Sequence, residues 1–464
     1  MSVSPPPVQS SRAETSHATG GELFGHPRGL TFLFATEMWE RFSYYGMRAL
    51  LVLYMVKYLL LAPHADNVFG FAAFRSWLEA MFGPLDTQPL ASQIYGFYTG
   101  LVYLTPIFGG LLADRALGQR RTVILGAALM AIGHFMMAFE RLFLLALFVL
   151  ILGNGAFKPN ISTQVGALYA PGDHRRDRAF SIFYVGINLG GFLAPLVCGT
   201  LGEEYGWHYG FAAAGVGMTA GLLIYLYATR TLPPDQFTRS HASGEPTRLT
   251  KADWRAIAAL FILFLPVTFF WATYEQQGNT IVLWADGFTD RGVDLLFWQG
   301  DIPVTWFQAL NPFMIFAFTP FIVALWRWQG AREPSTIAKM AIGCFLNAAS
   351  FLVLFAAAHF AGTDKASWLW LFVYFGVLTA GELYLSPTSL SLVTKVAPAR
   401  VLSTMMGVWL ATSFTGNFLA GYLGSLWSSM DKGKFFLMCA IIAALAGTVI
   451  VLISGPLRTA IKES

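Results

Sequence analysis

The chain alternates long apolar stretches with short polar breaks. A membrane-spanning helix needs about 20 consecutive, mostly apolar residues, and this requirement is met repeatedly. Twelve such stretches lie near residues 30–60, 91–113, 121–139, 142–161, 179–200, 207–229, 254–285, 303–326, 336–360, 367–394, 401–427 and 434–455. The pattern predicts an all-α polytopic membrane protein with twelve transmembrane helices.

Two polar breaks are longer than the others. The break from Thr231 to Asp253 is rich in proline and divides the twelve stretches into six and six. We therefore expect two six-helix bundles, at 30–229 and 254–455, with a linker at 230–253 and tails at 1–29 and 456–464. The other break, 61–90, carries apolar residues at helical spacing and predicts an amphipathic helix, lying either at the membrane interface or packed on the loop.

The distribution of Lys and Arg predicts the orientation. With both termini in the cytoplasm, 20 of the 30 basic residues fall on the cytoplasmic side, 6 on the outer side and the rest within spans. The positive-inside rule favours this arrangement.

Composition excludes several other classes of protein. Only 12% of the residues are charged, whereas soluble domains carry roughly 25%. The basic residues behind the net charge of +4 are scattered between apolar runs, so nucleic acid is not an expected partner. The three cysteines stand alone in apolar stretches, which predicts neither a metal site nor disulfides.

Seven ionisable residues interrupt the predicted spans. They are Glu37, Glu40, Arg41, Arg48, Lys158, Glu275 and Glu382. A charge at the bilayer centre costs about 2.5–3.5 kcal/mol on insertion scales, and such residues therefore face a bundle interior or a wet cavity. At about 100° per residue, the four in the first span share one helix face. The alternative to a functional cavity is that these residues form buried ion pairs that only set the register of the helices.

The net charge of these seven residues suggests that they bind a proton. Four carboxylates against three cations leave one negative charge, which a single bound proton would neutralise in a low-dielectric cavity. The sequence therefore suggests a proton carrier.

Several motifs resemble those of one family. They are Glu37-Met-Trp-Glu40-Arg41-Phe42-Ser-Tyr44-Tyr45-Gly46, the loop from Gly110 to Arg121, Gly153 to Asn160, Phe183 to Asn188, Trp271 to Gln276, Gln308 to Pro312, Gly381 to Pro387, and Met406 to Asn417. In this order they resemble the proton-coupled oligopeptide transporters, bacterial type, of the major facilitator superfamily. The resemblance implies the major facilitator fold, with two six-helix bundles around a central cavity.

The resemblance also implies residue roles. Proton coupling would involve Glu37, Glu40, Arg41, Lys158 and Glu382. Substrate binding would involve Arg41, Tyr44, Tyr45, Tyr103, Lys158, Asn188, Trp271, Trp306, Asn311, Glu382, Trp409 and Ser413. Two salt bridges, Arg48 with Glu275 and Lys158 with Glu382, would make and break between the bundles as the cavity opens to either side.

The expected function is proton-driven import of di- and tripeptides through the bacterial inner membrane, by a monomer, with protons as coupling ion and no other cofactor. Carriers of nitrate or other anions, of peptide-like drugs or of sugars remain alternatives. An enzyme is not expected, because no hydrolase motif or nucleotide-binding loop occurs. A receptor would not need seven membrane charges of both signs.

Overall fold

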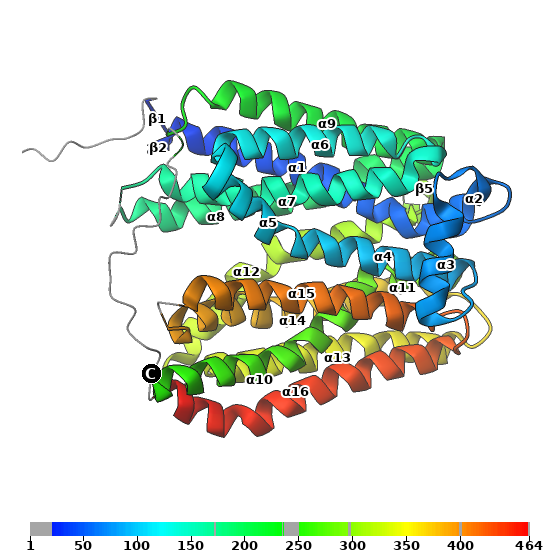
Figure 1. The fold of residues 1–464 in the computed structure, drawn as a ribbon. Helices are drawn as coiled ribbons and strands as arrows, with labels where there is room; N and C mark the ends of the chain where they lie inside the picture. The colour runs from blue at the N-terminus through cyan, green and yellow to red at the C-terminus, as the bar shows by residue number, and fades with distance from the viewer. Residues whose placement is uncertain are drawn as a thin grey trace, which may run out of the picture.

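The computed structural model describes residues 21–170, 173–233, 235, 250–295, 298–398 and 401–462. Most of the predicted linker at 230–253 and of the tail at 1–29 lies outside these residues, and the predicted division into two bundles stays a prediction. In Figure 1 the helices run roughly side by side, and α1 begins at the same end of the molecule at which α16 ends. We call this end the terminal side and the other end the opposite side.

The first group of elements, which we call the first lobe, comprises residues up to 228. Its elements are β1 (Glu22–Leu23), β2 (His26–Pro27), α1 (Arg28–Tyr54), η1 (Met55–Leu59), α2 (His64–Asn67), α3 (Phe71–Phe82), α4 (Thr87–Leu104), α5 (Pro106–Leu112), η2 (Ala113–Leu117), α6 (Gln119–Met136), η3 (Glu140–Leu142), α7 (Phe143–Ala167), α8 (Arg175–Ala194), η4 (Pro195–Gly199), η5 (Leu201–Tyr205) and α9 (Trp207–Ala228).

The second lobe comprises the elements from residue 251 onward. They are α10 (Lys251–Tyr274), η6 (Glu275–Gly278), α11 (Thr280–Gly287), β3 (Thr289–Asp290), β4 (Gly292–Leu295), β5 (Trp298–Asp301), η7 (Val304–Ala309), α12 (Leu310–Gln329), η8 (Gly330–Arg332), α13 (Thr336–Ala361), β6 (Ala366–Ser367), α14 (Leu369–Val396), α15 (Leu402–Ser425) and α16 (Lys432–Lys462).

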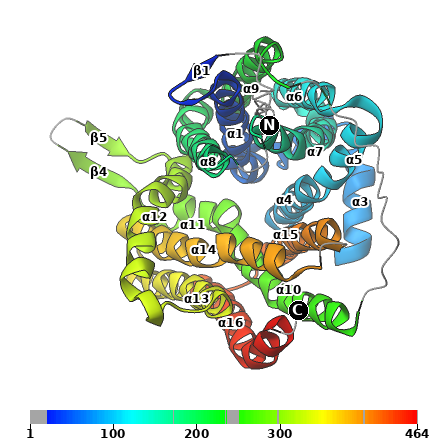
Figure 2. The same cartoon turned by 90° about the vertical axis from the view of Figure 1, so that its left-hand side faces the viewer.

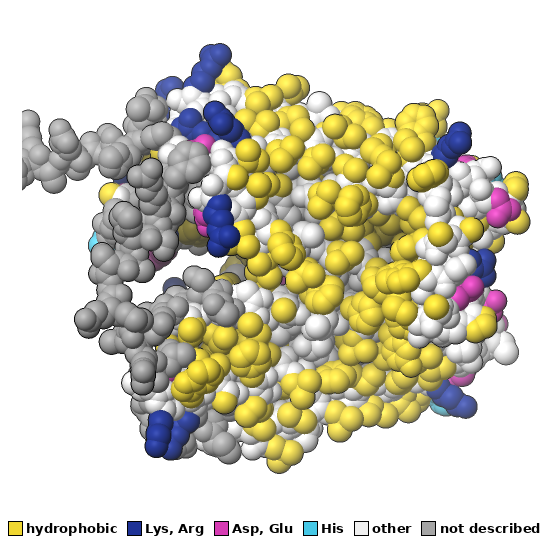
Figure 3. Space-filling model, in the orientation of Figure 1, with side chains coloured by type: hydrophobic (Ala, Val, Ile, Leu, Met, Phe, Trp, Pro, Cys, Tyr) yellow, Lys and Arg dark blue, Asp and Glu magenta, His cyan; other side chains and the backbone are white. Residues whose placement is uncertain are grey.

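Each predicted apolar stretch coincides with one long helical segment, some of them continued by short π-helical or 3-10 turns. Over the described residues, nine of these segments are long and apolar enough to cross a membrane. The other three, α1, α6 and α15, are helices of 27, 18 and 24 residues that carry more polar side chains. The protein is therefore an all-α polytopic membrane protein. Figure 3 shows the matching surface, a broad apolar belt with charged side chains gathered at the two ends.

Short strands also occur among the residues that the structure describes. β1 pairs with β2 and β4 with β5, both antiparallel, while β3 pairs with β6 in parallel. β1 and β2 precede α1, and the other strands lie in connections between helices, where backbone groups cannot be satisfied within a helix. The β4–β5 hairpin projects away from the helices in Figure 2.

The break at 61–90 contains the predicted amphipathic helix, α3. Phe71 and Leu78 are buried, whereas Trp77 and Met81 are about half exposed. Figure 2 shows α3 alongside both α4 and α15, and its Phe82 ring lies 6.2 Å from that of Phe418 on α15. The helix thus contacts both lobes.

Candidate functional site

A cavity of about 350 Å³ lies between the two lobes and is lined by residues of both. Its charged lining residues are Glu37, Arg41, Arg48 and Lys158 from the first lobe and Glu275 and Glu382 from the second. Six of the seven charges that interrupt the predicted spans therefore meet at one cavity. The seventh, Glu40, is fully buried behind it.

Helix α1 contributes the largest polar share of the wall. Glu37, Arg41, Tyr45 and Arg48 line the cavity and follow one another at intervals of four, four and three residues. This spacing keeps them on one face of a helix. Close neighbours on the other faces leave little room for side chains, since a Cβ atom on Gly46 would lie 2.6 Å from the sulfur of Cys198. The stripe is therefore held against the cavity by the packing behind it.

Arg41 is paired within its own helix. Its guanidinium donates to both carboxylate oxygens of Glu40, with Nη2 at 2.5 Å from Oε1, and its Nε lies 3.4 Å from Oε1 of Glu37. Asn154 on α7 also donates to Glu40, at 3.3 Å. The second oxygen of Glu37 has no hydrogen-bond partner among the described residues. Glu40 is therefore the saturated carboxylate of the pair, and Glu37 is the one that faces the cavity with an unused acceptor.

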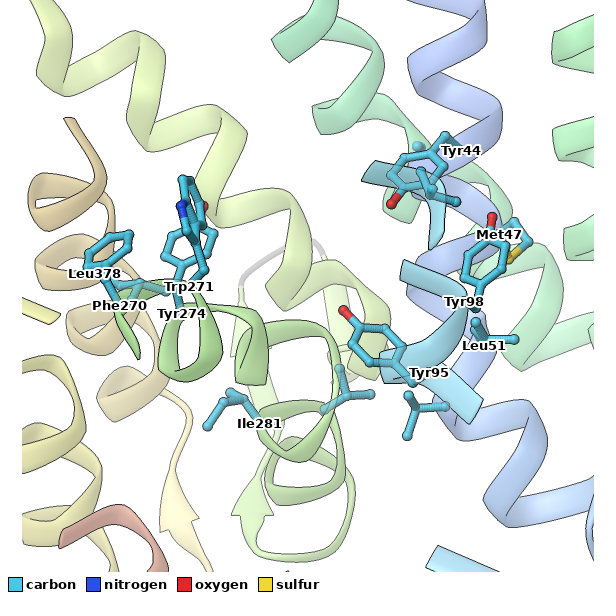
Figure 4. Close-up of a cluster of buried hydrophobic side chains, with 14 of the residues drawn as sticks. Tyr44, Met47, Leu51, Tyr95, Tyr98, Phe270, Trp271, Tyr274, Ile281 and Leu378 are labelled. Carbon is cyan, nitrogen blue, oxygen red and sulfur yellow. The ribbon is translucent and has the colours of Figure 1, made fainter. Parts of the chain in front are cut away.

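Arg48 is paired across the lobes. Its Nη2 donates to Glu275 of the second lobe, and its Nε donates to the hydroxyl of Tyr95 on α4 at 2.9 Å. Figure 4 shows the Tyr95 ring directed from α4 toward the space between the lobes, with Trp271 and Tyr274 of α10 on the far side. Arg48, Tyr95 and Glu275 together form a buried polar junction between α1, α4 and the end of α10.

The predicted salt bridge between Lys158 and Glu382 is not formed in this conformation. The Lys158 ammonium lies 4.7 Å from the centre of the Tyr103 ring. The Glu382 carboxylate instead accepts a hydrogen bond from Asn311, at 2.9 Å, within the second lobe. The two side chains face the same cavity from opposite lobes.

The remaining predicted binding residues divide into two sets. Tyr45, Tyr103, Asn188, Trp271, Asn311, Trp409 and Ser413 line the cavity. Tyr44 and Trp306 do not line it in this conformation, and their part in substrate binding stays a prediction. Tyr44 is buried, with its ring centre 5.1 Å from the Arg41 guanidinium carbon. The Trp306 indole donates to Thr200 of the first lobe at 2.8 Å. It therefore belongs to a contact between the lobes.

Sequence reasoning missed several lining residues, among them Ser162, Tyr184, Tyr274, Gln277, Gln308 and Ser386. Three of them stand four residues from a predicted one: Ser162 after Lys158, Tyr184 before Asn188, and Ser386 after Glu382. Side chains one helical turn apart share a face. The helical period around each recognised residue was the signal that could have identified them.

The cavity is closed toward the opposite side by contacts between the lobes. On α4, Gln88 donates to the carbonyl of Gly424 and Ser92 donates to Asn279. Farther along the same helix, a Cβ atom on Gly96 would lie 2.6 Å from the Cα atom of Gly421 on α15. Lys57 of η1 pairs with Asp286 of α11 at 2.6 Å. On the terminal side, Figure 3 shows a notch between the lobes.

Across the ranges that the structure describes, no group of three His, Cys, Asp or Glu side chains is arranged to hold a metal ion. The chemistry of the site lies in its charges, amides and aromatic rings.

Comparisons with known proteins agree with this geometry. The model of the POT family matches residues 120–243 and 236–438. A "Di-/tripeptide transporter" of Lactococcus lactis subsp. cremoris is 34% identical, over 94% of this chain and 96% of that protein. A crystal structure of a mutant of the peptide transporter POT in complex with alafosfalin has a TM-score of 0.82 at 30% identity, over 96% of this chain and 98% of that one. A crystal structure of a POT family transporter in complex with a thioalcohol conjugated peptide has a TM-score of 0.80 at 29% identity, over 94% of this chain and 98% of that one.

Proposed function

This chain belongs to the POT family, and on that premise we propose that it imports di- and tripeptides together with protons by alternating access. The observation that carries the proposal is the polarity of the cavity. Cations of the first lobe, Arg41 and Lys158, face a carboxylate of the second lobe, Glu382. A short peptide is a zwitterion, and its two charged ends fit these two walls. The names of the similar transporters support the same substrate class.

The residues between the two charged walls suit variable side chains. Arg41, Lys158 and Tyr45 bind the peptide carboxylate in this proposal, and Glu382, Asn188 and Asn311 bind the amino end and the backbone. Tyr103, Trp271, Trp409 and Ser413 supply an aromatic and weakly polar surface for the peptide side chains. At about 350 Å³, the cavity lies near the lower end of the roughly 300–1,000 Å³ typical of ligand pockets, which favours short peptides.

We assign the proton to Glu37. Glu40 is saturated by two hydrogen bonds from Arg41 and one from Asn154, so protonating it would break charge-assisted bonds. Glu37 lines the cavity and keeps an oxygen without a partner among the described residues. Protonation of Glu37 weakens its contact with Arg41, and the guanidinium, still held by Glu40, then binds a substrate carboxylate. Proton and peptide binding are coupled through this one guanidinium.

Alternating access in this proposal uses the two predicted salt bridges. The pair of Arg48 with Glu275 is formed in the structure, which is closed on the opposite side. The pair of Lys158 with Glu382 is the counterpart for the terminal side, and substrate competes for both of its members. By the distribution of basic residues the terminal side is cytoplasmic, which makes this conformation inward-facing. We further propose a monomer in the bacterial inner membrane, which catalyses no reaction and needs no cofactor besides protons.

The decisive experiment is uptake of labelled dialanine into proteoliposomes, with and without an inward proton gradient. We expect uptake that depends on the gradient and competition by other dipeptides. Single amino acids, nitrate and sugars should compete weakly. Competition by nitrate equal to that by dipeptides would instead indicate an anion carrier that uses Arg41 and Lys158, and would overturn the proposal.

Two Glu→Gln variants separate peptide binding from proton coupling. Glu382→Gln should weaken peptide binding at least tenfold, because the carboxylate loses its charge against the peptide ammonium. Glu37→Gln should keep peptide binding but remove the response of uptake to the proton gradient. Equal pH dependence in Glu37→Gln and the unmodified protein would remove Glu37 from proton coupling.

A further inference from the structure

A second junction closes the opposite side of the molecule, apart from the cavity. It joins the end of α8, through η4 and η5, to η7 and the start of α12. We call it the outer clasp, and its members are Gly199, Thr200 and Glu203 of the first lobe and Val304, Thr305 and Trp306 of the second. None of these six described residues lines the cavity. The proposed transport cycle has so far given them no role.

Glu203 makes most of the polar contacts of the outer clasp. Its Oε2 accepts from the backbone N–H of Val304 at 2.9 Å, and its Oε1 accepts from the backbone N–H of Thr305 at 2.8 Å. The Thr305 hydroxyl also donates to Oε1, at 2.6 Å. One carboxylate of the first lobe thus receives three hydrogen bonds from the second lobe.

The local chemistry explains why a carboxylate stands here. Val304 and Thr305 open the 3-10 turn η7, which runs on into α12, and the first N–H groups of a helix have no partner within it. An anion at that end is favoured by the unpaired N–H groups and by the helix dipole. Hydrogen bonds to an ionised acceptor are also roughly twice as strong as neutral ones.

The backbone around Glu203 is built for close approach. Any Cβ atom on Gly199 would collide with the Thr305 side chain, so only glycine allows η4 to come this near. The Trp306 indole donates to the Thr200 hydroxyl at 2.8 Å beside it. Both contacts orient η7 toward the end of α8, and both are lost together with the Glu203 contacts if the lobes part on this side.

We propose that Glu203 is a gating residue, which stabilises the state closed on the opposite side by binding the start of η7 across the lobes. The inference rests on the alternating access of the proposed function. Opening of this side requires all three hydrogen bonds to break at once, and the carboxylate then returns to water. Because Glu203 lies outside the cavity, it changes the balance between the closed and open states and leaves the substrate contacts untouched.

The neighbouring glutamate provides a matched control. Glu204 follows Glu203 directly and is exposed, so Glu204→Gln makes the same chemical change without touching the outer clasp. Thr305→Val removes only the hydroxyl donor at nearly constant shape, and it protects the test against a Glu203 variant that does not fold. Thr305→Ser keeps the hydroxyl and should behave like the unmodified protein.

The test measures the distance between spin labels at Tyr209→Cys in the first lobe and Thr363→Cys in the second, in the full-length protein in lipid. Both positions are exposed on the opposite side, and the three native cysteines are buried. We expect Glu203→Gln to raise the ratio of long to short distances roughly tenfold or more, because hydrogen bonds to a charged acceptor are lost. Thr305→Val should raise it less, and Glu204→Gln should leave it unchanged.

Two results would overturn the inference. One is an unchanged distance distribution in both Glu203→Gln and Thr305→Val, and the other is an equal change in Glu204→Gln. The distance measurement needs no peptide, so it decides the role of Glu203 even if peptide uptake fails. In the uptake assay, Glu203→Gln should change the maximal rate at least threefold with an unchanged affinity for dialanine, whereas a purely structural role would lower only the amount of folded protein.

Discussion

Helix α1 carries two buried arginines seven residues apart, and they are paired in opposite ways. Arg41 is 4% exposed and binds Glu37 and Glu40 of its own helix, whereas Arg48 is 7% exposed and binds Glu275 of the other lobe. The first set of contacts persists whatever the distance between the lobes. The second exists only while the lobes meet. One helix therefore holds a chemical switch and a conformational one, two turns apart.

This difference follows from where the acids lie. Glu37 and Glu40 stand four residues and one residue before Arg41 on the same helix, so their contacts with it can change only by protonation or by competition from a substrate. A carboxylate on another lobe can also be lost by movement. The comparison predicts that changes at Arg41 alter proton response and binding, and that changes at Arg48 alter the balance of conformations.

The largest expected effect comes from breaking the contact across the lobes. Glu275→Ala leaves Arg48 buried without its partner, and breaking such a pair costs about 3–5 kcal/mol. The closed state should be destabilised by this amount, and peptide uptake should be lost. Thermal unfolding and the outer spin-label distance measure the two consequences.

The control for this change is the double variant of Arg48→Met with Glu275→Met. Replacing both charges by apolar groups of similar size is often nearly neutral for stability, so this variant should regain most of the melting temperature but not the uptake. A double variant as unstable as Glu275→Ala would show that the ion pair itself is not the cause.

The next effect concerns the two acids that hold Arg41. Glu40→Gln removes a charged acceptor that receives two bonds from Arg41, and hydrogen bonds to charged groups are worth about 1.5–3 kcal/mol. Glu37→Gln removes a longer contact of 3.4 Å and should cost clearly less stability. Thermal unfolding of the two variants in the same detergent gives the comparison, and a larger loss in Glu37→Gln would contradict the assignment of Glu40 as the fixed partner.

A smaller effect is expected from adding a single methyl group where α4 and α15 meet on the opposite side. A Cβ atom on Gly421 would lie 2.8 Å from the carbonyl oxygen of Ser92, and overpacking of this kind costs about 1–3 kcal/mol. Gly421→Ala should therefore lengthen the outer distances and weaken the pairing of Arg48, while the proton response that depends on Arg41 persists. Gly407→Ala on the same helix meets no atom within 4 Å and should behave like the unmodified protein.

The smallest effect is expected from a solvent-exposed ion pair that has the same four-residue spacing as Glu37 and Arg41. Arg75 and Glu79 of α3 are four residues apart, with 2.9 Å between Nε and Oε1, and the hydrogen bond from Arg75 lowers the pKa of Glu79. The stabilisation is complete above the ordinary glutamate pKa of 4.5 and disappears as the pH falls through the lowered folded-state pKa. Glu79→Gln should leave uptake unchanged and shift thermal stability barely measurably above pH 5. A loss of uptake would show that α3 has a role beyond packing.

The helices were largely predictable because each apolar stretch must bury its backbone in helical hydrogen bonds to cross a bilayer. The stripe on α1 was also predictable, since Glu37, Arg41 and Arg48 lie on one face by helical periodicity alone. Trp306 shows the limit of this reasoning. Its sequence neighbourhood resembles that of a binding residue, but the close approach of η4 and η7 at Gly199 places its indole in the outer clasp.

The sequence by itself determined that this is a helical membrane protein and which few charges it keeps inside its spans, because the cost of charge in a bilayer acts on each helix separately. Only the tertiary structure decided which charges are partners. Arg41 could have paired with either acid of its helix or with a distant one, and Lys158 and Glu382 do not pair at all in this conformation. Pairing depends on distances between helices, which are fixed by how the two lobes pack and not by the period of any single segment.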